Sequence, residues 1–172
     1  DRSMHSHIVG NMVEMLADGY KSRFGPLPVW FVKGLSHWFR RRIEPRINLI
    51  REDEDWDNMG HRSWDWASRV YGRVRHDYFP TTVSLCDQRS AEKWGLQEHM
   101  MCWSRVDFLM QRHPGGLRRF LDFLCDHPIP LGRVSVPRAR AWQLDGLARS
   151  WLLTPNGFDA QWRSYVLLKY AR

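Results

Sequence analysis

Histidines are the side chains with the clearest chemical potential in this chain, because their spacing could create a metal site. His5 and His7 lie two residues apart, so on a helix they face different directions and cannot bind one metal ion together. A surface position is the simpler interpretation of this pair. We expect no histidine cluster unless folding brings distant residues together, because the remaining ones show no ligand spacing to one another: His61, His76, His99, His113 and His127.

Two short segments nevertheless have the order and spacing of a catalytic pair of helices. Residues 5–14 read HSHIVGNMVE, and residues 27–38 read LPVWFVKGLSHW. Together they resemble the two motif helices of gluzincin metallopeptidases of the peptidase-MA-like group. In that group an H-E-x-x-H helix is followed, one helical hairpin later, by a P-x-W-x-x-E-G-L-A-E helix. Residues 98–109, 117–121 and 159–166 resemble later helices of the group, so the resemblance covers most of the chain.

The resemblance implies the position of a zinc site and also the loss of its chemistry. A gluzincin holds zinc with two histidines at i and i+4 and a glutamate from the following helix, while another glutamate activates water. By position, His7 matches the first histidine, Asn11 the second, and Lys33 the metal-binding glutamate. An amide is a poor zinc ligand, and an ammonium group repels a cation. Ile8 replaces the general base, and His37 stands where a supporting glutamate is common.

These replacements suggest a specific role for Lys33. Its ammonium group could take the place of the metal and hydrogen-bond to Asn11 or His7, with Glu14 one turn further along the same face. A lysine in that place would hold the two helices together. The competing interpretation is that Lys33 is simply solvated, since it lies on the most polar face of its helix. That face consists of Val29, Lys33, Ser36, His37 and Arg40.

The densest basic cluster of the chain lies a few residues after Lys33 and His37. Arg40, Arg41 and Arg42, with Arg46 nearby, lie at the end of the second motif helix, where positive charge complements the helix dipole. An anion patch that binds phosphate is the alternative role. Nucleic-acid binding is the lesser alternative, because no helix-turn-helix, RNP or zinc-finger signature accompanies the cluster. The acidic stretch 52–57 lacks a calcium-loop pattern, so we interpret it as a solvated loop or a partner for the arginines.

The composition is that of a folded, basic protein. With 43% hydrophobic and 13% aromatic residues over 172 positions, the chain can bury a core. Its ten tryptophans are best explained by core packing. The net charge of +7 permits nucleic acid, anionic lipid or an acidic partner without requiring any of them. No apolar run approaches the roughly 20 residues of a membrane span. Three cysteines are too few for a disulfide framework or a Cys-based zinc site: Cys86, Cys102 and Cys125.

Apolar residues recur at helical spacing along most of the chain. On the first helix Ile8, Met12 and Met15 form an apolar stripe, and residues 80–95 have no clear pattern. No repeat or linker divides residues 1–172, so we predict a mainly α fold, a single multi-helix domain resembling the C-terminal helical part of a gluzincin. The predicted helices cover residues 5–17, 28–42, 63–78, 98–112, 117–125, 138–151 and 157–170.

We therefore interpret the protein as a catalytically inactive pseudo-peptidase, without metal or cofactor, that binds a protein or peptide partner or serves as a structural module. Two alternatives remain open. One is a zinc metallopeptidase with a non-standard ligand set, for instance His37, or His5 with His7. The other is a nucleic-acid-associated basic helical protein that uses the Arg40 to Arg46 cluster. We assign no catalytic residue and no compartment.

Overall fold

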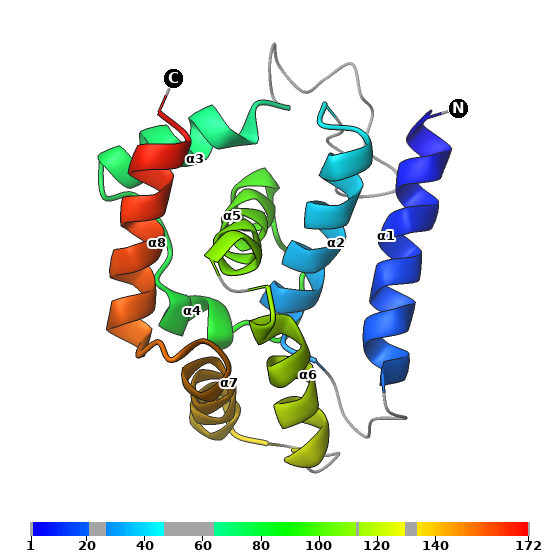
Figure 1. The fold of residues 1–172 in the computed structure, drawn as a ribbon, viewed down its shortest axis with the longest axis vertical. Helices are drawn as coiled ribbons and strands as arrows, with labels where there is room; N and C mark the ends of the chain where they lie inside the picture. Colours follow the sequence, from blue (N-terminus) through cyan, green and yellow to red (C-terminus); the bar gives the residue numbers. More distant parts are fainter. Residues whose placement is uncertain (1, 21–26, 47–63, 113, 130–133, 172) are drawn as a thin grey trace.

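In a computed structural model of the protein, helix α5 lies at the centre of the fold (Figure 1). The other helices surround it, except α1, which lies outside α2. The structure describes residues 2–20, 27–46, 64–112, 114–129 and 134–171. These residues contain helices and no β-strand, which confirms the predicted mainly α fold class. The helices found in them are α1 (Arg2–Gly19), α2 (Val29–Ile43), α3 (Trp66–Arg75), α4 (Thr82–Cys86), α5 (Leu96–Arg112), α6 (Gly116–Asp126), α7 (Val136–Trp151) and α8 (Pro155–Lys169).

The central helix packs chiefly against α2, and α2 in turn separates it from α1 (Figure 1). Gly34 allows the close approach of α2 and α5, because a Cβ atom there would lie 2.6 Å from the Cys102 carbonyl oxygen. Helices α3, α6 and α8 contact α5 from its other sides, and α6 and α7 pack against each other. The result is one compact helical unit in which α5 is enclosed and α1 lies at the flank.

Tryptophans fill much of this core, as the composition predicts. Trp30 donates from Nε1 to Gln143 Oε1 at 3.0 Å, and Trp162 donates to Ser104 Oγ at 3.0 Å, so both polar edges are satisfied. The three cysteines are free, and burial raises the pKa of Cys86 to about 12, which leaves an inert thiol. The buried tryptophans are Trp30, Trp38, Trp66, Trp94, Trp151 and Trp162.

The predicted helices are present, and two local differences have clear causes. Residues 80–95 contain α4, which is too short to produce a periodic pattern and begins where Thr81 accepts a hydrogen bond from Ser84 N–H at 3.1 Å. The helix predicted to reach Tyr78 ends at Arg75 instead. Asp77 adopts a left-handed conformation with φ 55°, and the Tyr78 N–H bonds back to the Arg73 carbonyl at 2.9 Å.

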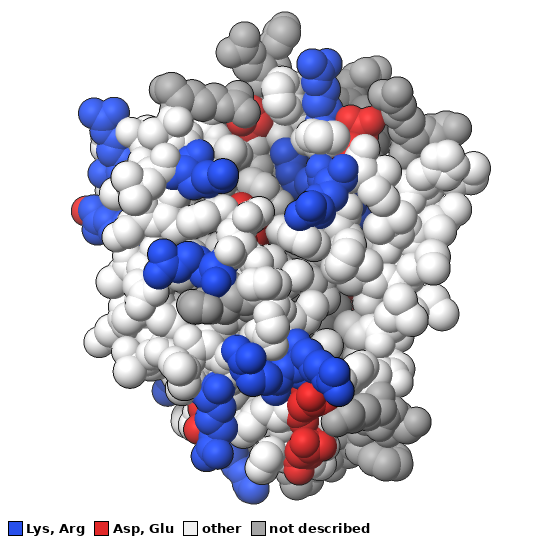
Figure 2. All heavy atoms as spheres, in the orientation of Figure 1, with Lys and Arg blue, Asp and Glu red and all other residues white. Residues whose placement is uncertain are grey.

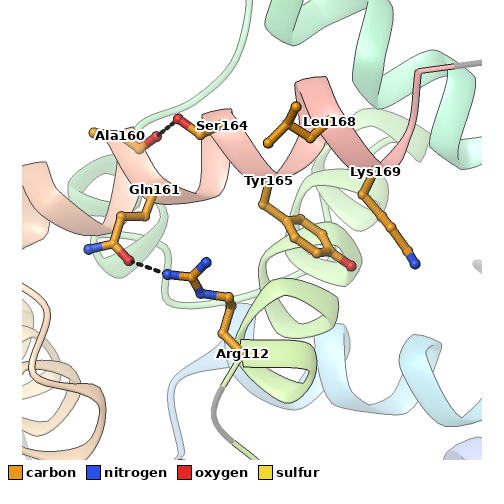
Figure 3. A pocket seen from close by; sticks show the side chains of 7 residues that line it. All are labelled: Arg112, Ala160, Gln161, Ser164, Tyr165, Leu168 and Lys169. Atoms are coloured by element: carbon orange, nitrogen blue, oxygen red, sulfur yellow. Dashed lines mark hydrogen bonds between the residues drawn. The ribbon is translucent and has the colours of Figure 1, made fainter.

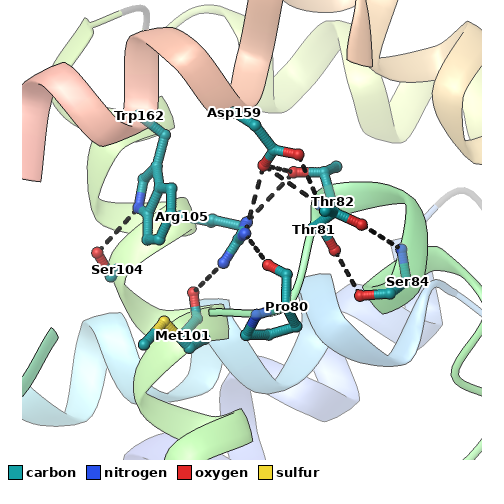
Figure 4. A network of polar contacts seen from close by, with 9 residues as sticks. All are labelled: Pro80, Thr81, Thr82, Ser84, Met101, Ser104, Arg105, Asp159 and Trp162. Atoms are coloured by element: carbon teal, nitrogen blue, oxygen red, sulfur yellow. Dashed lines mark hydrogen bonds and ion pairs between the residues drawn. The ribbon is translucent and has the colours of Figure 1, made fainter. Parts of the chain in front are cut away.

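A buried arginine fastens α5 to α4 and α8 (Figure 4). Arg105 is fully enclosed and donates to Thr82 Oγ1 at 3.2 Å, to Asp159 Oδ1 at 3.3 Å and to the Pro80 carbonyl. Its guanidinium carbon lies 4.0 Å from the centre of the Trp162 ring. Burial of this charge carries a desolvation penalty, which lowers the pKa of Arg105, and the ion pair and hydrogen bonds offset that penalty.

The flanking helix α1 turns its small residues towards α2 and its large ones towards solvent. Ser6, Gly10 and Ala17 are buried, and Gly10 leaves the space that the Arg40 guanidinium fills. No helix in the described residues is long and apolar enough to cross a membrane. The apolar stripe of α1 is 48–73% exposed and consists of Met4, Ile8, Met12, Met15 and Leu16.

Candidate functional site

A cavity of about 670 Å³ lies where the start of α2, the loop 87–95 and the first turn of α5 meet. It combines ionisable side chains with a buried imidazole, which is the combination that marks candidate binding sites in a fold. Lys33, which the sequence singles out, is part of its wall. The lining residues are Val29, Lys33, Arg89, Ser90, Ala91, Glu92 and His99.

Lys33 binds a carboxylate of the neighbouring helix. Its Nζ lies 3.0 Å from Glu14 Oε1 and 2.8 Å from Oε2, so one ammonium group engages both oxygens. The side chains are 33% and 26% exposed. Within the described residues, no hydrogen bond joins Lys33 to His7 or Asn11. Lys33 is thus neither simply solvated nor bonded to the two side chains named as its partners from the sequence; it links α2 to α1 through Glu14.

Behind Lys33, two histidines from different helices form a buried pair. His37 Nε2 on α2 and His99 Nδ1 on α5 are 2.9 Å apart, and both side chains are 4% exposed. Trp66 packs edge-on against His37, and Trp94 against His99. One ring nitrogen must donate and the other accept, so the pair shares a single proton at this contact.

The surroundings hold both imidazoles in the neutral form. Burial lowers the pKa of His37 well below its ordinary value, and the neighbouring His99 and Arg40 lower it further. Burial, followed by the charges of Lys33 and Arg40, lowers the pKa of His99 to about 4. Desolvation and nearby positive charge act in the same direction on a histidine. At neutral pH the pair is therefore an uncharged donor–acceptor unit next to the cavity.

Three of the five residues on the polar face of α2 are buried, while Val29 and Lys33 are partly exposed. Ser36, His37 and Arg40 are nearly inaccessible, because α1 covers this side of α2 and α5 covers the next. Ser36 Oγ donates to the Gly10 carbonyl of α1 at 3.3 Å. The polarity of this face therefore does not mean that all of it is solvated. Periodicity could not reveal this, because polar residues are buried only when other helices supply partners.

The remaining motif positions lie on α1 and do not form a zinc site. His7, Asn11 and Glu14 follow one another at i, i+4 and i+7 on one side of α1, with Asn11 exposed and His7 half-buried. Ile8 is 48% exposed on another side, and His5 is exposed. One imidazole, one amide and an ammonium-bound carboxylate do not fit the ligand set of zinc. Within the described residues there is no group of three or more side chains suited to a metal ion.

The arginine cluster at the end of α2 is used largely for packing on aromatic rings. Arg40 is buried, and Arg41 donates to the Trp64 carbonyl at 2.7 Å while its guanidinium lies 4.3 Å from the centre of the Trp66 ring. Burial lowers the pKa of Arg41 to about 10. Arg42 lies 4.5 Å from the Trp38 ring, and Arg46 lies 5.3 Å from the Trp64 ring. The acidic stretch 52–57, its suggested partner, lies outside the described residues.

A second hollow, of about 480 Å³, lies along α8 (Figure 3). Its polar groups bond to each other or to the core: Arg112 donates to Gln161 at 3.4 Å, and Ser164 donates to the Ala160 carbonyl at 3.1 Å. Tyr165 donates to Asp107 at 2.7 Å, and burial raises its pKa. Unlike the cavity beside Lys33, which contains the buried His99, this hollow is lined by no fully buried ionisable side chain. The cavity beside Lys33 is therefore the better candidate for a binding site.

Comparisons with known proteins were made at three levels. No protein-family model, no curated protein and no solved structure matched this chain.

Proposed function

We propose that this protein is a catalytically inactive, peptidase-like helical domain that acts as a protein-binding or structural module. The observation that carries the proposal is the ion pair between Lys33 and Glu14, which joins α2 to α1. In the gluzincins that the sequence resembles, the metal ion joins the corresponding two helices. The ammonium group of Lys33 would supply the positive charge at this junction in place of the metal.

The charges around Lys33 disfavour hydrolysis by a bound metal. A divalent cation beside Lys33 would be repelled by an ammonium group that already holds the nearest carboxylate, Glu14. At 4 Å and an effective dielectric constant near 20, two unit charges interact by about 4 kcal/mol, and a divalent ion doubles that repulsion. Ile8 at the general-base position is an alkyl side chain and cannot take a proton from water.

The outer face of α1 supports the second part of the proposal, the binding of a protein surface. Its five large apolar side chains form a stripe from Met4 to Leu16, and the part of the α1 flank that faces the viewer is almost entirely white in Figure 2. Exposed apolar stripes of this size mark interaction surfaces, and methionines adapt well to a partner.

The first test is the metal content of the purified protein, together with its melting temperature in the presence and absence of a chelator. We expect less than about 0.1 zinc per chain and an unchanged melting temperature. About one zinc per chain, with a lower melting temperature after chelation, would contradict the proposal. That result would favour a metalloenzyme with a non-standard ligand set. The buried histidines His37 and His99 would then be the first candidate zinc ligands to test by substitution.

A sharper test restores the site. The triple variant Ile8→Glu, Asn11→His and Lys33→Glu recreates the four positions of a gluzincin centre together with the native His7. If the helices have the gluzincin arrangement, this variant should bind about one zinc per chain, whereas the matched single variant Lys33→Glu should bind none. Circular dichroism shows whether the triple variant folds. A folded triple variant that binds no zinc would contradict the peptidase-like arrangement.

A further inference from the structure

A basic groove of about 490 Å³ lies on α3 and the turn that follows it, away from the cavity beside Lys33. Basic side chains gather over α3 at the upper left of Figure 2. The polar groups that line the groove are two guanidinium groups, an imidazole and two hydroxyl groups, and no carboxylate takes part. The lining residues are Ser68, Arg69, Gly72, Arg73, His76 and Tyr78.

The end of α3 is shaped so that an aromatic ring closes one side of the groove. Asp77 adopts the left-handed conformation, with φ 55°, at a position usually taken by glycine. As a result the Tyr78 N–H bonds to the Arg73 carbonyl, and the Tyr78 ring lies 5.2 Å from the Arg73 guanidinium carbon. Tyr78 is 66% exposed. The turn therefore holds a large aromatic surface beside two arginines.

The nearest carboxylates have other partners. Asp65 caps the start of α3 by accepting from the Ser68 N–H at 3.3 Å, and Asp77 forms an ion pair with Arg163 of α8. Arg69 has no ion pair within the described residues, and it lies one helical turn from Arg73, where like charges repel each other. A bound anion would relieve this repulsion. Gly72, between them, leaves the helix surface open, because nothing lies within 4 Å of the position of its Cβ.

We propose that this groove binds a nucleotide unit, either free or within a single strand of nucleic acid. Arg69 and Arg73 bind the phosphate group, and the Ser68 hydroxyl and the His76 imidazole are within the same groove to donate to its oxygens. The face of Tyr78 turned away from Arg73 stacks on the base, as aromatic residues do in single-strand binding. This site is separate from the proposed peptidase-like function and does not depend on it.

The test measures the fluorescence anisotropy of a labelled 12-nucleotide single-stranded RNA of mixed sequence, at 50 mM and 200 mM salt. We expect the double variant Arg69→Gln/Arg73→Gln to weaken binding at least tenfold at 50 mM salt. Its plot of log affinity against log salt should be shallower by about 0.7, because the two arginines bind one phosphate and each neutralised phosphate of a single strand contributes about 0.7 to the slope. Tyr78→Ala should weaken binding several-fold, whereas Tyr78→Phe should not.

The matched control removes the same charge from the opposite end of the molecule. Arg118 and Arg149 are exposed on α6 and α7, and the double variant Arg118→Gln/Arg149→Gln should change the affinity less than threefold. Displacement of the RNA by AMP but not by inorganic phosphate would identify a free nucleotide as a sufficient ligand; no displacement by AMP would point to the strand. An equal loss of RNA affinity in the control variant would overturn the proposal. So would the absence of RNA binding by the folded wild-type protein at a protein concentration of about 1 mM.

Discussion

Among the described residues, the ion pair of Arg105 with Asp159 and the ion pair of Lys33 with Glu14 each join two helices, and they lie in contrasting environments. Arg105 of α5 is fully enclosed, and its guanidinium group bonds to Asp159, to Thr82 and to two backbone carbonyls (Figure 4). Lys33 of α2 bonds to Glu14 at the wall of a cavity, and about a third of its side chain is exposed. The first pair is part of a closed network, and the second remains accessible to solvent.

The difference indicates what each region can do. A charge enclosed as deeply as Arg105 cannot exchange its partners without unfolding its surroundings, so the network fixes the arrangement of α4, α5 and α8. An ion pair at a cavity wall is screened by water and contributes little to stability, so a ligand or partner can compete for its charges at small cost. We therefore expect Lys33 to take part in binding and Arg105 to have a purely structural role.

The largest effect is expected at the enclosed pair. Arg105→Met should lower the free energy of unfolding by about 3 to 5 kcal/mol, because the Asp159 carboxylate loses the charge that balances it and keeps only its hydrogen bonds from Thr82. Denaturation in guanidinium chloride, followed by circular dichroism, measures the loss. Adding Asp159→Asn should recover part of it, since the second change removes the unpaired charge. A loss below 1 kcal/mol in Arg105→Met would show that the network is not the structural centre of the fold.

An intermediate effect is expected from acid at the histidine pair behind Lys33. Burial holds the folded-state pKa values of His37 and His99 below the value of about 6.5 expected in the unfolded chain, and that of His99 is about 4. Their contribution to stability is fully present above pH 6.5. It is lost as the pH falls from 6.5 towards 4, because the unfolded chain binds protons that the folded chain excludes. For His99 this loss is on the order of 2 kcal/mol at pH 5.

The measurement is the melting temperature between pH 8 and pH 4.5. His99→Gln should flatten the decline between pH 6.5 and pH 5, because the variant no longer has the titrating ring. The matched control His76→Gln replaces an exposed histidine and should leave the decline unchanged. If the wild-type protein and His99→Gln lose stability in parallel, then the pair is not held neutral by its surroundings.

The smallest effect is expected at the accessible pair. Lys33→Met should cost about 1 kcal/mol or less, because both side chains remain in contact with water. A double-mutant cycle with Glu14→Gln should give a coupling energy of about 0.2 to 1 kcal/mol, measured by urea denaturation. A coupling energy above 3 kcal/mol would place Lys33 and Glu14 among the structural interactions of the core and would remove the contrast with Arg105.

The long helices and the aromatic character of the core can be predicted from the order of the amino acids alone. Repeats of apolar residues at helical spacing depend only on neighbours along the chain, so the long helices were predicted within a few residues of their observed ends. The tryptophan content also predicted a core built from large aromatic rings, and six of the described tryptophans are buried. The exceptions are local: α4 has too few residues for a period, and α3 ends early because Asp77 adopts a left-handed conformation that side-chain type alone does not specify.

Only the tertiary structure shows which side chains pair with Lys33 and His37 in the candidate site. The sequence selected Lys33 and His37 and named Glu14 as a neighbour, but it treated His99 as ordinary, because 62 positions separate the two histidines of the pair. It also could not show that the polar face of α2 is buried between α1 and α5. Periodicity reports which residues share a face of one helix. The packing of several helices decides which polar side chains are buried and which of them form hydrogen bonds with each other. Burial and these contacts in turn shift the pKa values of the side chains.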